Sequence, residues 1–354
     1  MLFIRKYLPF LILLGVVLAV WFGLASLPTD GPWVAFTDRL AAFTTVFLGI
    51  FMEAAPFLLL GTLASGVVEV FISQDDMARL APKNPLQGAV VGGLLGLFFP
   101  VCECGVVPFT RRLFRKGLPL SVGISFLLAA PVLNPIVILS TYAAYGWSPV
   151  LWLRIGLSLA IAIITGMIFA LEPNPARLVR PVTLPSLSNI GYGGGGDDRA
   201  PKLPPITAAP LTVTPPSLTQ RLRSVFIIAA DEFFEMGFYL VLGAALAALM
   251  QTVVPQSWLI SLGQNAFLSV VIMMAIGVLL SICSTVDAFV ALAFVNVFPT
   301  GSILAFLVFG PMVDIKSVLM YLRVFNLRTV LYLVALPALM TLLAGLFLNF
   351  NVPF

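Results

Sequence analysis

The stretch Phe98-Phe99-Pro100-Val101-Cys102-Glu103-Cys104-Gly105 interrupts a long apolar run and holds two of the three cysteines in the chain. The third cysteine lies in a similar interruption, Ser281-Ile282-Cys283-Ser284-Thr285. Proline, glycine and polar residues at such places favour an irregular backbone. The two interruptions predict a fold with two related halves, each contributing cysteine to a shared site.

Composition indicates a polytopic membrane protein. Of 354 residues, 60% are hydrophobic and 10% charged, and the mean hydropathy is +1.08. A spanning helix needs about 20 apolar residues, and several runs have that length. These runs are too long and too uniformly apolar for the strands of an outer-membrane barrel, so we expect an all-α fold.

Several functional classes are not supported by the sequence. Histidine is absent, and three cysteines without secreted-scaffold spacing do not suggest a disulfide framework. The chain has no Gly-rich Lys-Ser/Thr loop for nucleotide phosphates. We expect no cofactor, no enzymatic activity and no nucleic-acid partner. The net charge is +4, but the positions of the basic residues matter more than their sum, because these positions report membrane orientation.

Four segments are expected. Residues 1–38 form an N-terminal transmembrane helix and a periplasmic loop, residues 39–171 a first membrane repeat, and residues 223–354 a second one. Residues 172–222, rich in proline and glycine, form a flexible cytoplasmic linker. Basic residues before the first apolar run place the N-terminus in the cytoplasm, and following the crossings from there places the C-terminus in the periplasm. Residues 1–26 could instead be a cleaved signal peptide.

The positive-inside bias also predicts two re-entrant hairpins. A full span through residues 86–100 would leave the basic run 111–116 outside, whereas a hairpin that returns at Cys102 keeps this run inside as a topology anchor. Lys316 is expected at a cytoplasmic turn, and Glu232 near the membrane interface.

The second half repeats the first in weakened form. Matching residues lie 180 to 182 positions apart: Glu53 with Glu235, Gly61 with Gly243, Cys102 with Cys283, Pro131 with Pro311, and Asn134 with Asp314. The first repeat has an odd number of full crossings, so the second should have inverted topology, with broken helices near Asn134 and Asp314.

In an inverted repeat, the hairpin tips and broken helices meet near the bilayer midplane. We therefore expect a substrate site there, composed of Cys102, Cys104, Cys283, Asn134, Ser284, Thr285 and Asp314. Thiolates without imidazole suit a thiophilic solute, such as trivalent arsenic or antimony species or a soft monovalent metal. The three cysteines are thus also the candidate metalloid ligands.

Carboxylates inside the membrane are costly without a partner or a water path. Glu103 and Asp287 are therefore the leading candidates for proton coupling, because they lie beside the cysteines. Glu53 and Glu235 are further candidates, with a structural bond to a freed backbone amide as the alternative role.

The motif at residues 99–105, followed by Ala130-Pro131-Val132-Leu133-Asn134-Pro135, resembles the ArsP-type predicted permeases of bacterial inner membranes. Over residues 40–350 the resemblance implies an efflux permease, linked in some members to trivalent organoarsenicals, arsenite or antimonite. It also implies that Cys102 and Cys104 contact the metalloid.

Two other functions stay open at this stage. One is a permease of the same fold for a small sulfur-containing or other anion, and the other is a membrane thiol oxidoreductase that cycles Cys102 and Cys104. The physiological substrate, transport direction, coupling ion and oligomeric state are not determined by the residues.

Overall fold

The computed structural model describes residues 15, 34–80, 82, 84–172, 178, 217–253, 265–295 and 297–351. Most of the predicted first helix and most of the predicted linker lie outside these residues. Helices account for the regular structure of the described parts, apart from one isolated bridge residue.

The first half consists of α2 (Val34–Phe71), α3 (Gln74–Leu80), α4 (Pro85–Leu95), the 3-10 turn η1 (Gly96–Phe98), α5 (Glu103–Arg115), α6 (Leu120–Leu133), α7 (Pro135–Tyr145) and α8 (Pro149–Ala170). The second half consists of α9 (Leu218–Val253), α11 (Ala266–Leu280), α12 (Asp287–Leu292), α13 (Thr300–Met312), α14 (Ile315–Val324) and α15 (Leu327–Asn351).

Six helical segments of the described chain are long and apolar enough to cross a membrane: Thr37–Phe71, Leu120–Tyr145, Pro149–Ala170, Leu218–Val253, Thr300–Val324 and Leu327–Asn351. Two apolar helices, Pro85–Phe98 and Ala266–Leu280, are shorter than a span. This arrangement confirms the expected all-α membrane fold and leaves one short helix ahead of each cysteine segment.

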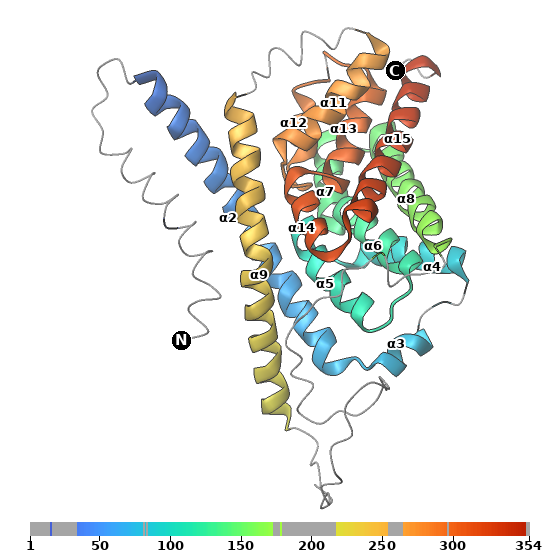
Figure 1. Cartoon of the computed structure of the whole chain (residues 1–354). Helices are drawn as coiled ribbons and strands as arrows, with labels where there is room; N and C mark the ends of the chain where they lie inside the picture. Colours follow the sequence, from blue (N-terminus) through green and yellow to red (C-terminus); the bar gives the residue numbers. More distant parts are fainter. Residues whose placement is uncertain are drawn as a thin grey trace, which may run out of the picture.

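Corresponding helices of the two halves pack in the same way. Helix α4 packs on α6 and α8, while α11 packs on α13 and α15. Figure 1 shows α4 toward the lower end of the molecule and α11 toward the upper end. The long helices α2 and α9 pack against each other, and they run in opposite directions (Figure 1).

Breaks between helices occur at the two predicted positions. The backbone is extended at Asn134, between α6 and α7, and at Asp314, between α13 and α14. Each side chain caps the helix that follows, because Asn134 accepts from the Val137 N–H and Asp314 from the Ser317 N–H. Pro131 and Pro311, near the end of the preceding helices, weaken the helical hydrogen bonding there.

Helix α2 approaches α5 so closely that only glycine fits at the contact. A Cβ atom at Gly61 would lie 2.3 Å from the carbonyl oxygen of Gly105 and 2.4 Å from its Cα. These are backbone atoms that cannot rotate away. The contact therefore fixes the start of α5, which carries the first two cysteines.

Gly61→Ala is expected to lower the free energy of unfolding by about 1 to 3 kcal/mol through overpacking. Gly49→Ala on the same helix is the matched control, because a Cβ there meets nothing within 4 Å. That control should be neutral or stabilising by up to about 1 kcal/mol, since alanine is the better helix former. Denaturant unfolding in bicelles measures both, and equal effects of the two substitutions would contradict the packing argument.

Candidate functional site

The first cysteine segment leads from η1 into α5. Pro100 lies in the extended connection, and Cys102 is the residue immediately before α5, with φ −76° and ψ 175°. The N–H groups of Gly105 and Val106 donate to the Cys102 carbonyl at 3.1 Å each. Cys102 and Cys104 are both buried free thiols.

The second cysteine segment connects α11 to α12. Ser281 ends α11 with φ +49°, the only positive φ among described residues other than glycine. Such a conformation costs about 1 to 3 kcal/mol and persists only where the surroundings hold it. The Ser281 hydroxyl donates to Asp314 at 2.6 Å, and its carbonyl accepts from Lys316 at 2.7 Å. This segment is therefore held by the second broken helix.

The two cysteine segments meet, although 181 residues separate Cys102 from Cys283. Cys104 lies two residues after Cys102, in the first turn of α5. Ligand atoms of Cys102, Glu103 and Cys283 all lie within 4.8 Å of one another. The exposed fraction of each cysteine is 3% or less, so all three thiols are shielded from solvent.

A buried lysine lies beside this cluster. Lys316 Nζ is 3.4 Å from Glu103 Oε1 and 3.3 Å from Asp314 Oδ2. All three residues have exposed fractions of 2 or 3%. Two carboxylates thus share one ammonium group, which leaves one formal negative charge next to the three thiols when all three groups are ionised.

The expectation that Lys316 lies at a cytoplasmic turn is wrong. This side chain points into the protein because α14 packs on α5 and α9, which brings Lys316 to Glu103. The available signal was its position two residues after the break at Asp314, inside the second half of an apolar segment. A charge at such a place favours a buried partner over a loop.

Asp287 forms a buried ion pair with Arg154 at the start of α12. Arg154 Nη2 lies 2.6 Å from Asp287 Oδ2, and Arg154 Nη1 donates to Thr141 Oγ1 at 2.8 Å. Sequence reasoning missed Arg154, although it is the only charged residue in the 22 residues of α8. The pair joins α8 of the first half to α12 of the second.

Glu235 and Glu232 of α9 form a second set of ion pairs. Glu235 accepts from Arg111 at 3.2 Å and from Arg323 Nε at 2.8 Å. Glu232 accepts from Arg112 at 3.4 Å and from Ser65 at 2.5 Å. The set links α2, α5, α9 and α14.

The charged residues of this set are buried between helices. Arg111 and Arg112 are 1% and 7% exposed, and Glu232 is 2% exposed. Each of these arginines is paired with a glutamate of α9. The topology anchor at residues 111–116 and the position of Glu232 near the membrane interface stay predictions.

The remaining predicted residues divide into two groups. Thr285 donates to half-buried Glu53 at 3.4 Å, and Ser284 is buried with its Oγ free of any hydrogen-bond partner among the described residues. Asn134 is buried and caps α7. Asn134 therefore has a structural role in the described geometry, whereas Ser284 adjoins the thiol cluster through Cys283.

Comparison with known proteins identifies the family. The model of the ArsP-type predicted permeases matches residues 39–350. The chain belongs to this family. Two relatives are similar to this permease over most of their length.

A protein of Bacillus subtilis strain 168, "UPF0718 protein YcgR", is 41% identical over 304 residues, which cover 85% of the chain and 95% of the relative. A Streptococcus mutans protein, "Putative two-component membrane permease complex subunit", is 33% identical over 300 residues, 84% of the chain and 92% of the relative. No solved structure matches the permease. Family and helices together indicate a multi-pass membrane transporter.

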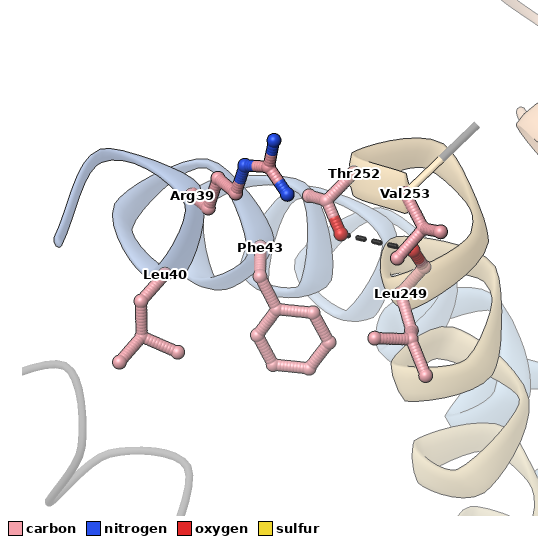
Figure 2. Close-up of a pocket in the computed structure, with 6 residues that line it drawn as sticks. All are labelled: Arg39, Leu40, Phe43, Leu249, Thr252 and Val253. Atoms are coloured by element: carbon pink, nitrogen blue, oxygen red, sulfur yellow. Dashed lines mark hydrogen bonds between the residues drawn. The ribbon is translucent and has the colours of Figure 1, made fainter. Parts of the chain in front are cut away.

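A surface pocket of about 370 Å³ lies between the start of α2 and the end of α9 (Figure 2). Its lining residues are Arg39, Leu40, Phe43, Leu249, Thr252 and Val253. None of the predicted site residues is among them. The cysteines of the permease are instead closed to solvent.

Proposed function

We propose that this permease is a secondary exporter of a thiophilic solute in a bacterial inner membrane. Trivalent organoarsenicals, arsenite and antimonite are the proposed cargo. The observation that supports this most is the meeting of the buried free thiols of Cys102 and Cys283, from two distant segments, with the free thiol of Cys104 in the first turn of α5. Three soft ligands in a chain without histidine suit a thiophilic solute better than magnesium or calcium.

Alternating access between two inverted repeats is the proposed mechanism. In its support, α4 and α11 lie toward opposite ends of the molecule, and α2 runs opposite to α9 (Figure 1). The short apolar helices would then be the first arms of re-entrant hairpins, because neither is long enough to span. The N-terminus would face the cytoplasm and the C-terminus the periplasm.

The ion pairs indicate how access could alternate. Arg154–Asp287 connects the two halves on one side of the thiols, and the Arg111–Glu235–Arg323 set connects them through α5, α9 and α14. In the proposed cycle one set opens while the other stays closed, and protons move in exchange for cargo through Glu103. An imposed pH gradient should therefore change the export rate, and an unchanged rate would remove proton exchange.

The relative described as a complex subunit suggests a second polypeptide for this permease too. Copurification from the native membrane after mild solubilisation tests this part. A single species containing this chain alone would argue against a stable partner.

Cys102→Ser combined with Cys104→Ser is expected to reduce methylarsenite accumulation in inverted membrane vesicles to the level of vesicles without the protein. The reason is that serine keeps the size of the side chain but removes the soft ligand atom. Ser224→Ala, on the exposed face of α9, is the control and should transport at the wild-type rate. Wild-type transport by the double cysteine variant would show that the thiols are not the site.

A further inference from the structure

Glu103 has one carboxylate oxygen that the fold leaves without a partner. Its Oε1 lies 3.4 Å from Lys316 Nζ, whereas Oε2 is buried and has no hydrogen-bond partner among the described residues. The residue is 3% exposed. Leaving a buried oxygen of this kind unpaired is costly, so such a group needs an explanation.

This carboxylate adjoins two of the three thiols. Cys102 Sγ, Cys283 Sγ and a Glu103 oxygen lie within 4.8 Å of one another. Metal–sulfur and metal–oxygen bonds are about 2.0 to 2.3 Å long, so ligands of one ion are closer together than about 4.6 Å. A small rotation of these side chains toward one another would therefore let the three donor atoms surround a single ion. The donors come from both halves of the chain, at the proposed transport site.

We infer that the thiol cluster also binds a borderline-soft divalent cation, Zn²⁺ or Cd²⁺, with Cys102, Cys283 and Glu103 as ligands. This inference rests on the proposed function, since it concerns the cargo of the same site. Two thiolates and a carboxylate form a mixed sulfur and oxygen donor set that such cations accept in proteins. A neutral arsenical would need the sulfurs alone.

Charge balance supports a divalent cation. When the ion binds, the two thiols release two protons, because the thiolate is the ligand. Two positive charges replace two protons, so the net charge of the enclosed site is unchanged. A change in buried charge would be expensive in this environment.

Lys316 acts in this scheme as a positioning residue. It holds Oε1 while Asp314 and the Ser281 carbonyl hold the ammonium group. The other oxygen of Glu103 is thereby directed to the cation. Such outer contacts orient a ligating carboxylate and tune metal affinity.

Cd²⁺ binding to the purified full-length protein in detergent tests the inference. The thiolate-to-cadmium charge-transfer band in the ultraviolet reports binding, and X-ray absorption of the wild-type complex reports the donor atoms. We expect one ion per chain, with both sulfur and oxygen donors. Glu103→Gln should weaken binding by about 10- to 100-fold, the range typical when a contact that supports a metal site is lost. Asp75→Asn, which makes the same carboxylate-to-amide change at an exposed position of α3, is the matched control and should leave the affinity unchanged.

The outcomes separate the two proposals. The cation site is overturned if cadmium has sulfur ligands only, or if the Glu103→Gln variant binds cadmium with wild-type affinity. If the same preparation still binds methylarsenite, the exporter proposal stays intact. The absorption measurement needs no variant, so a misfolded substitution does not leave the inference without a test. If the wild-type protein binds neither cadmium nor methylarsenite, both proposals are contradicted.

Discussion

Lys316→Met is expected to lower the free energy of unfolding by about 3 to 5 kcal/mol, because it leaves two buried carboxylates without their shared cation. Glu103 and Asp314 lie 3.4 and 3.3 Å from the Lys316 ammonium, and all three are almost fully buried. Methionine has a similar length and can fill the space. The lost stability should therefore come from the missing charge and not from a change in side-chain volume. Denaturant unfolding in bicelles gives the value.

Glu103→Gln provides the matched comparison for this lysine. It removes one of two negative charges and leaves Lys316 paired with Asp314 alone, so we expect a change below about 1 kcal/mol, a typical net value for one exchanged hydrogen bond. The explanation fails if Glu103→Gln destabilises the protein as much as Lys316→Met. It also fails if Lys316→Met unfolds like the wild type.

Arg154→Met should cost a similar amount, about 3 to 5 kcal/mol, because Asp287 would stay buried with no counter-charge. The pair is short, at 2.6 Å, and both residues are less than 5% exposed. It also joins helices of the two halves. Its loss is therefore expected to loosen the contact between α8 and α12 as well as to lower stability.

Adding Asp287→Asn to Arg154→Met should restore most of that stability, since replacing both members of a buried pair is often close to neutral. Arg223→Met, at an exposed position of α9, is the control and should stay within about 0.5 kcal/mol of the wild type. If the double variant is no more stable than Arg154→Met alone, the unpaired charge is not the cause.

Sequence reasoning succeeded where the signal is local. Apolar runs and proline positions predicted the membrane class and the helix breaks at Asn134 and Asp314. It was wrong for Lys316, which was assigned to a cytoplasmic turn and lies buried in α14. The positive-inside bias treats each basic residue by itself, and it carries no information on whether a carboxylate lies opposite.

From the residues alone one can deduce an all-helical membrane protein with cysteines at two interruptions, because hydropathy and backbone breakers act over one or two helical turns. Only the tertiary structure decides that Arg154 pairs with Asp287, 133 residues away, and that Lys316 lies between Glu103 and Asp314. Each of these ion pairs depends on the relative positions of helices that are far apart in the sequence. A buried charge without a partner is costly, so the stable packing is one that brings the opposite charges together.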